Sequence, residues 1–140
     1  MELRTILIVE DNAADVYLIR TAITEANIHA DVQVVRDGEQ AIRFIDEVEG
    51  ELELPCPALV VLDINLPRKQ GGDVLKHLRQ SRRGAHTLVI AISTSDSQHD
   101  RESMMGLGAN GYFRKPSEYA DFMKLGDMIK DVLNRAPGPM

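Results

Sequence analysis

Short apolar runs alternate along the chain with longer stretches in which apolar and polar residues are mixed. The runs are rich in Ile, Val and Leu and are too short for a buried helix. Because most of them contain no regularly spaced polar residue, they are typical of strands covered on both faces of a sheet. We predict strands at 5–9, 32–35, 58–62, 88–92 and 111–113.

The intervening stretches carry apolar residues three and four positions apart, which indicates amphipathic helices. The spacing is clear in Ile19, Ala22, Ile23 and Ala26. Gly108 follows the fourth stretch, where glycine suits a C-terminal helix cap. We predict helices at 14–27, 72–80, 98–107 and 118–133, and one that begins after Asp37-Gly38 and carries Ala41, Ile45 and Val48.

The segment 47–57 interrupts this alternation. It is acidic, and the prolines of Pro55-Cys56-Pro57 prevent a helix from continuing, so we predict an exposed loop. We interpret its negative charge as a solvated helix end and loop in preference to a charged docking patch, because runs of charge are usually solvated.

Strands that alternate with helices predict an α/β fold, in which a doubly wound parallel sheet of five strands is covered by five helices. Right-handed crossovers place these helices on both faces of the sheet. We expect one domain at 1–135 and a C-terminal tail at 136–140, with no output domain. In such sheets, ligands bind at the carboxyl ends of the strands, near the point where the strand order reverses.

Composition narrows the class of protein. A length of 140 residues, 44% apolar and 27% charged, is typical of one folded domain. A net charge of −6 with scattered basic residues argues against a nucleic-acid surface. The apolar runs are far shorter than the roughly 20 residues of a membrane helix, and the first residues do not form a signal peptide. Cys56 is the one cysteine, so no internal disulfide forms, and we expect a cytoplasmic protein.

The residues that can carry chemistry follow the predicted strands. They are Glu10 and Asp11 after the first strand, Asp63 after the third, Ser93 and Thr94 after the fourth, and Lys115 after the fifth. Because the carboxyl ends of parallel strands share one edge of the sheet, we expect three carboxylates, a hydroxyl and an ammonium group to converge there. Neighbouring carboxylates repel one another unless a cation joins them, and oxygen ligands favour Mg²⁺.

A carboxylate at this place can also attack phosphorus and form an acyl phosphate. Mg²⁺ and Lys115 supply the positive charge that phosphoryl transfer requires. Taken alone, Glu10-Asp11-Asn12 equally suits a helix N-terminus and the run at 93–97 a helix cap. Asp63 is harder to explain in this way, because an unpaired acid at the end of a buried strand costs free energy. The signals on all four strands together favour a phosphorylation site.

Three segments resemble the motifs of response-regulator receiver domains, which have the CheY-like fold. They are Val9-Glu10-Asp11-Asn12, Leu62-Asp63-Ile64-Asn65-Leu66-Pro67 and Tyr112-Phe113-Arg114-Lys115-Pro116. The resemblance covers nearly the whole chain. It implies that Glu10, Asp11 and Asp63 hold Mg²⁺ together with the backbone carbonyl of Asn65.

The same resemblance implies roles around the phosphate. Asp63 accepts the phosphoryl group, Lys115 binds it, and Ser93 is the switch hydroxyl. Tyr112 is the aromatic residue whose rotamer follows Ser93 and which turns inward on phosphorylation. Ser93 stands where threonine is commoner, a change that keeps the hydrogen bond but restrains the side chain less.

The interval between Asp11 and Asp63 is longer than in most receivers, and the surplus lies in the acidic loop at 47–57. With the run Glu-Asp-Asn-Ala-Ala-Asp, it resembles the small regulators that pair with phytochrome-type histidine kinases. The resemblance implies a partner that is such a histidine kinase or a phosphotransfer protein. It also implies output through protein contacts on the face formed by 98–107, 111–113 and 118–133, and it is compatible with a homodimer.

The protein is expected not to be an enzyme, apart from assisting its own phosphorylation and dephosphorylation. A receiver-like adaptor that binds partners without phosphorylation usually lacks an acid or the lysine, and none is missing here. A phosphohydrolase requires a second carboxylate two residues after the nucleophile, where this chain has Asn65. The phosphoacceptor switch is therefore the leading hypothesis.

Overall fold

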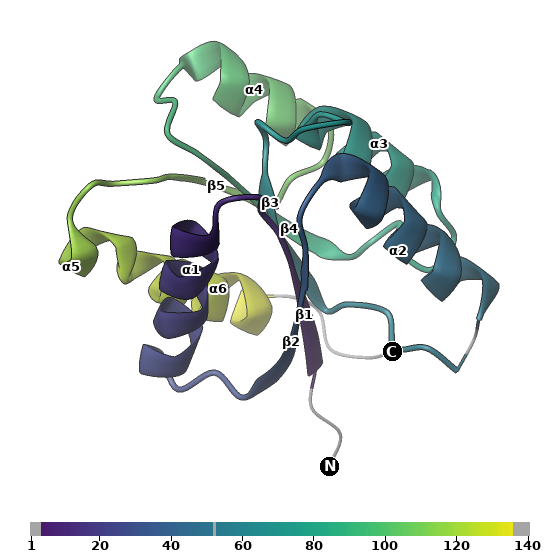
Figure 1. Cartoon of the computed structure of the whole chain (residues 1–140), viewed down its shortest axis with the longest axis horizontal. Helices are drawn as coiled ribbons and strands as arrows, with labels where there is room; N and C mark the ends of the chain where they lie inside the picture. Colours follow the sequence, from purple (N-terminus) through teal and green to yellow (C-terminus); the bar gives the residue numbers. More distant parts are fainter. Residues whose placement is uncertain (1–3, 52, 136–140) are drawn as a thin grey trace.

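The computed structural model describes residues 4–51 and 53–135, and within these ranges it has one sheet of parallel strands (Figure 1). The strands are β1 (Arg4–Val9), β2 (Ala30–Val35), β3 (Leu59–Asp63), β4 (Leu88–Ser93) and β5 (Gly111–Arg114). Their spatial order is β2-β1-β3-β4-β5. The predicted doubly wound sheet is confirmed. Its strand order reverses between β1 and β3, which places a crevice at their carboxyl ends.

Helices cover both faces of this sheet. They are α1 (Ala13–Glu25), α2 (Gly38–Gly50), α3 (Gly71–Gln80), α4 (Gln98–Gly106), α5 (Tyr119–Phe122) and α6 (Lys124–Arg135). Figure 1 shows α1, α5 and α6 on one side and α2, α3 and α4 on the other. Alternate residues of β1 serve the two layers: Ile6 and Ile8 pack toward α1 and α6, whereas Leu7 and Val9 pack toward α2 and α3. A central strand buried on both faces must be apolar throughout, which explains its unbroken run.

The helix predicted at 118–133 is divided at Met123 into α5 and α6. Phe122 is buried at the end of α5, where its ring meets Phe113 edge-on at 5.9 Å. Beyond Met123, Gly126 lies against the backbone of Ala22 in α1, where a β-carbon would collide with the Ala22 carbonyl oxygen. Two tertiary contacts, of Phe122 with Phe113 and of Gly126 with Ala22, thus position the two helices. The spacing of apolar residues in the sequence does not predict these contacts.

Two connections between elements, after α4 and after α2, differ in how closely they match the sequence predictions. Gly108 has φ +103°, and its N–H donates to the Met105 carbonyl, which confirms the predicted cap of α4. The segment predicted as an exposed loop at 47–57 begins as helix, because α2 continues to Gly50, and it ends with Pro57 buried. The predicted tail at 136–140 lies outside the described residues. No helix in the described part of the chain has the length and apolar character needed to span a membrane.

Candidate functional site

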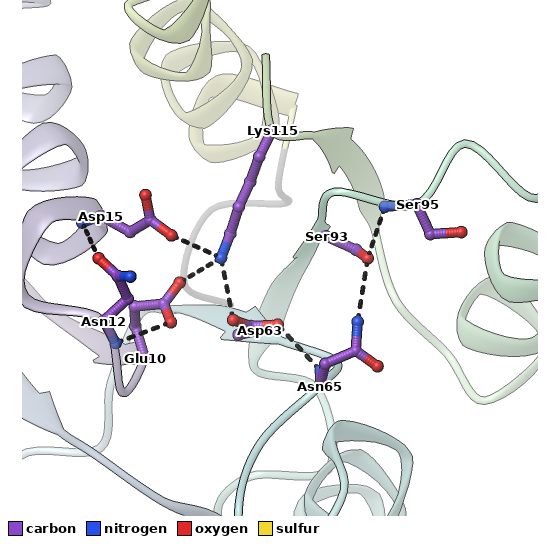
Figure 2. Close-up of polar contacts among 8 residues, drawn as sticks. All are labelled: Glu10, Asn12, Asp15, Asp63, Asn65, Ser93, Ser95 and Lys115. Carbon is purple, nitrogen blue, oxygen red and sulfur yellow. Dashed lines mark hydrogen bonds and ion pairs between the residues drawn. The ribbon is translucent and has the colours of Figure 1, made fainter. Parts of the chain in front are cut away.

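The predicted residues meet at the carboxyl edge of the sheet. Glu10 directly follows β1, and Lys115 directly follows β5. Asp63 and Ser93 are the last residues of β3 and β4, which each end one residue later than predicted, because strand pairing extends to Asp63↔Ile92 and Ser93↔Arg114. Figure 2 shows the side chains of Glu10, Asp63 and Lys115 converging on one another, and the hydroxyl of Ser93 directed toward Asn65 and Ser95.

Three carboxylates form an oxygen cluster in this space. One oxygen each from Glu10, Asp11 and Asp63 lies within 4.8 Å of the others. The side chain of Glu10 is fully buried, that of Asp63 is nearly so, and Asp11 is exposed. A donor set of oxygen atoms alone, open on one side, suits a hard divalent cation such as Mg²⁺. The residues present therefore fit the metal that the sequence predicted.

Lys115 crosses the site from the opposite side. Its Nζ lies 2.6 Å from Glu10 Oε1, 2.9 Å from Asp15 Oδ2 and 2.9 Å from Asp63 Oδ2 (Figure 2). The backbone N–H of Lys115 donates to the Ser93 carbonyl at 2.6 Å, which fixes the residue beside β4. Burial opposes the charge of its ammonium group, but the three carboxylates outweigh burial and raise the pKa of Lys115.

For the buried carboxyl group of Glu10, the influences that disfavour its charged form outweigh the contact with Lys115. Burial is the largest influence, and the neighbouring Asp63 adds to it, so that the pKa of Glu10 rises to about 7 despite the contact with Lys115. Its second oxygen accepts the backbone N–H of Asn12 at 3.2 Å. A divalent cation at this cluster would relieve the repulsion that raises this pKa.

Asp63 is oriented by contacts at both of its oxygens. Oδ2 accepts from Lys115, and Oδ1 accepts the backbone N–H of Asn65 at 2.9 Å. Gly71, the first residue of α3, donates its N–H to the Ile64 carbonyl. A β-carbon on Gly71 would lie 2.7 Å from the carbonyl oxygen of Asp63. The loop after β3 and the start of α3 are therefore pressed together behind the aspartate.

Ser93 faces the loop after β3 and the loop after β4. Its hydroxyl oxygen accepts from the Asn65 side-chain amide at 3.4 Å and from the Ser95 backbone N–H at 3.0 Å (Figure 2). The residue is 1% exposed. Asn65 thus contacts Asp63 through its backbone N–H and Ser93 through its side-chain amide. A contact between its backbone carbonyl and a metal stays a prediction.

Tyr112 is already inside the protein in this structure. It is 5% exposed, and its hydroxyl donates to the Ser95 carbonyl at 2.9 Å. The guanidinium carbon of Arg101, in α4, lies 5.1 Å from the centre of the ring, within cation–π range. A hydrogen bond and a stacked arginine thus hold Tyr112 inward in this structure, and a movement of its ring that follows Ser93 on phosphorylation stays a prediction.

Sequence reasoning assigned no role to Asp15, Ser95, Arg101 or Gly71. Of these, Asp15 could most readily have been predicted from the sequence, because it lies in the first turn of α1, shortly after Glu10 and Asp11. The backbone N–H of Asp15 is capped by the side-chain oxygen of Asn12 at 3.0 Å, which fixes this first turn.

A family model described as the response regulator receiver domain matches residues 6–126. Response regulator Rcp1 of Synechocystis is 32% identical over 123 residues, which span 87% of this chain and 83% of Rcp1. The probable methanogenesis regulatory protein FilR2 of Methanothrix harundinacea is 32% identical over 137 residues, 96% of this chain and 88% of FilR2.

Solved structures show the same likeness. The phosphorylated cyanobacterial phytochrome response regulator RcpA superposes with a TM-score of 0.85 at 30% identity, covering 99% of this chain and 100% of RcpA. The Mn²⁺-bound form of Rcp1 superposes with a TM-score of 0.83 at 29% identity, covering 98% of this chain and 99% of that chain. Metal binding and phosphorylation are thus recorded in proteins that share this fold and nearly its full length.

Proposed function

The chain belongs to the family of response regulator receiver domains, and on that premise we propose that it is a phosphoacceptor switch in which Asp63 receives the phosphoryl group. One observation carries this proposal: the carboxylate of Asp63 lies both in the oxygen cluster with Glu10 and Asp11 and 2.9 Å from the ammonium group of Lys115. A nucleophile with a cation on one side and a cation-binding cluster on the other is suited to phosphoryl transfer.

In the proposed reaction, a carboxylate oxygen of Asp63 forms a bond to phosphorus as the bond between phosphorus and the donor nitrogen breaks. The electron pair of that bond stays with the imidazole nitrogen of the donor phosphohistidine. The imidazole, protonated at its other nitrogen, leaves as a neutral ring. Lys115 lies beside the attacking oxygen, since its ammonium group contacts Asp63, and it can bind a phosphoryl oxygen once one of its carboxylate contacts is exchanged.

We propose that Glu10, Asp11, Asp63 and the backbone carbonyl of Asn65 hold Mg²⁺. When bound, Mg²⁺ supplies positive charge against the phosphoryl oxygens. The oxygen cluster supports this assignment. A metal-bound relative supports it too, although the ion there is Mn²⁺.

The proposed switch runs from Ser93 to Tyr112. The hydroxyl oxygen of Ser93 accepts two N–H groups, so its own hydrogen is available to donate to a phosphoryl oxygen. A shift of Ser93 toward the phosphate would strain its contact with Ser95, whose carbonyl holds the Tyr112 hydroxyl. We therefore propose that the output surface is the face formed by α4, β5, α5 and α6. This surface contacts partner proteins, among them a second copy of the chain in a homodimer.

We propose a histidine kinase of the phytochrome type, or a phosphotransfer protein, as the donor. The likeness to RcpA, a phytochrome response regulator, supports this choice. We place the protein in the cytoplasm, where such kinases use ATP, and the thiol of Cys56 agrees with a reducing compartment. We propose that the protein assists its own phosphorylation and dephosphorylation.

Incubation with acetyl phosphate and Mg²⁺, followed by intact-protein mass spectrometry, tests the proposal. Wild type should gain one phosphoryl group, and hydroxylamine should remove it, as expected of an acyl phosphate. Asp63→Asn should gain none, and chelation of Mg²⁺ should abolish uptake by wild type. If wild type gains nothing while a receiver of proven activity is phosphorylated in the same mixture, the chain is instead a receiver-like adaptor.

A further inference from the structure

The ammonium group of Lys115 is saturated by its three carboxylate contacts. A lysine ammonium carries three N–H donors. Its partners are the carboxylates of Glu10, Asp15 and Asp63, at 2.6, 2.9 and 2.9 Å, one for each hydrogen (Figure 2). A phosphoryl oxygen can therefore gain a full hydrogen bond from Lys115 only if one of these contacts is weakened.

The three carboxylates differ in how readily they can be released. The side chain of Glu10 is 0% exposed and that of Asp63 is 7% exposed, whereas that of Asp15 is 25% exposed. A buried carboxylate that loses its partner bears the full cost of desolvation, but water can replace the partner of a partly exposed one. The N-terminal turn of α1 also favours the negative charge of Asp15 after release. The Asp15 contact is thus the one that is exchanged at least cost.

The position of Asp15 also sets the charge that an incoming donor meets. Asp15 lines an open groove together with Thr94, Arg114 and Lys115. Asp63 does not line this groove, but Lys115 does and contacts Asp63, so a phosphodonor that approaches Lys115 along the groove carries negative charge past the carboxylate of Asp15. Competition for Lys115 and repulsion of the donor therefore act in the same direction.

We infer that Asp15 is a positioning residue that holds Lys115 before phosphorylation and thereby limits the rate at which Asp63 takes up a phosphoryl group. The inference rests on the proposed function of Asp63 and adds to it a control on rate. It requires no movement of the backbone, because the Asn12 cap holds the first turn of α1 while the Asp15 side chain exchanges Lys115 for water.

The test compares initial rates of phosphoryl uptake from sub-saturating acetyl phosphate in Mg²⁺, followed by intact mass. Asp15→Asn should raise the rate roughly two- to fivefold at low ionic strength, equivalent to losing one partly exposed ion pair. The gain should shrink at high salt, because screening weakens the charge of Asp15 in wild type. Asp15→Glu, which keeps the charge, should react at nearly the wild-type rate.

Asp121→Asn is the matched control, because Asp121 lines the same groove but pairs with Lys124 at 3.1 Å. Its rate should equal that of wild type. An Asp15→Asn rate at or below the wild-type rate overturns the inference, and so does an equal gain in both variants, which would reflect general charge only. Phosphoryl uptake by wild type separates failure of the proposed function from failure of this inference. If wild type takes up no phosphoryl group, both are overturned. If wild type takes it up normally and Asp15→Asn has no effect, this inference alone is overturned.

Discussion

At the scale of single residues, the site depends on close backbone contact as much as on charge. Gly71 opens α3 directly behind Asp63, and its N–H is bonded to the Ile64 carbonyl. A β-carbon there would lie 2.5 Å from Ile64 Cα and 2.7 Å from the Asp63 carbonyl oxygen, closer than packed atoms tolerate. Both neighbours are backbone atoms and cannot rotate away. Gly71 therefore allows α3 to support the proposed phosphoacceptor.

Gly71→Ala is expected to lower the free energy of unfolding by about 1–3 kcal/mol, the usual cost of overpacking. It should also slow phosphoryl uptake, because the backbone that carries Asp63 must shift. Urea unfolding and the acetyl phosphate assay measure the two effects. Gly72→Ala is the control: its β-carbon would meet Leu107 Cδ1 at an ordinary 3.5 Å, and alanine favours helix, so stability should be equal or higher. Equal losses in both variants would contradict the role given to Gly71.

At the scale of elements, the long connection from α2 to β3 is tied to the loop between α3 and β4. The guanidinium group of Arg83 donates to the carbonyls of Val48, Glu51 and Leu54, at 2.5, 2.9 and 2.8 Å. In return, the carboxylate of Glu49 accepts the backbone N–H groups of Arg82 and Arg83, at 2.8 and 2.9 Å. Glu49 belongs to the acidic segment that we interpreted as solvated, but its carboxylate accepts structural hydrogen bonds from another loop.

This contact predicts a dependence of stability on pH. The backbone hydrogen bond from Arg83, followed by that from Arg82, lowers the pKa of Glu49. A carboxyl group with a lowered pKa in the folded state contributes stability above its ordinary pKa, and this contribution is lost as pH falls through the folded-state value. Glu49→Gln should therefore have a lower Tm than wild type at pH 7, and the difference should disappear in acid.

Thermal unfolding from pH 7 to pH 3 measures this difference. Glu47→Gln provides the comparison, since Glu47 is an exposed acid of the same run and should leave Tm unchanged throughout. A Glu49→Gln deficit that persists unchanged at pH 3 would assign the loss to packing and not to charge.

At the scale of the whole molecule, part of the net charge of −6 is concentrated at the carboxyl edge of the sheet. Glu10, Asp11, Asp15 and Asp63 share the edge of the sheet with one ammonium group, so the folded chain gathers more acid there than Lys115 neutralises. The unfolded chain does not hold these groups together. A divalent cation should therefore bind the folded protein and stabilise it.

Addition of Mg²⁺ is expected to raise Tm, with a gain in free energy of about 2.7 kcal/mol at a hundredfold excess over the dissociation constant. Because the pKa of Glu10 is about 7 in the metal-free protein, a proton competes with the ion below that pH. The apparent affinity should fall as pH decreases below 7 and level off above it. Titration calorimetry and thermal unfolding at pH 6 and pH 8 measure both effects.

Asp11→Asn separates metal binding from fold stability. Asp11 is exposed, so its substitution should leave the metal-free Tm nearly unchanged while it removes most of the stabilisation by Mg²⁺. A full response to Mg²⁺ in this variant would show that the ion binds elsewhere on the protein.

The sequence alone determined the architecture and the location of the site. Buried parallel strands must be apolar throughout, so their runs were visible, and the residues that follow them had to meet at one edge. Glu10, Asp11, Asp63, Ser93 and Lys115 were identified for that reason. These predictions required only the period of apolar positions and the direction of the strands.

Tertiary structure decided which of these groups touch and what holds them. Asp15 and Lys115 are a hundred positions apart, and their contact arises only where the start of α1 meets the end of β5. Neighbours from other elements likewise decide three further features: the division of the last helix at Met123, the inward position of Tyr112 against Arg101, and the hydrogen bonds of Arg83 to the carbonyls after α2. Local pattern records whether a residue is buried and on which face, but the partner of a charged or polar group is set by packing between elements distant in the chain, and no local pattern contains it.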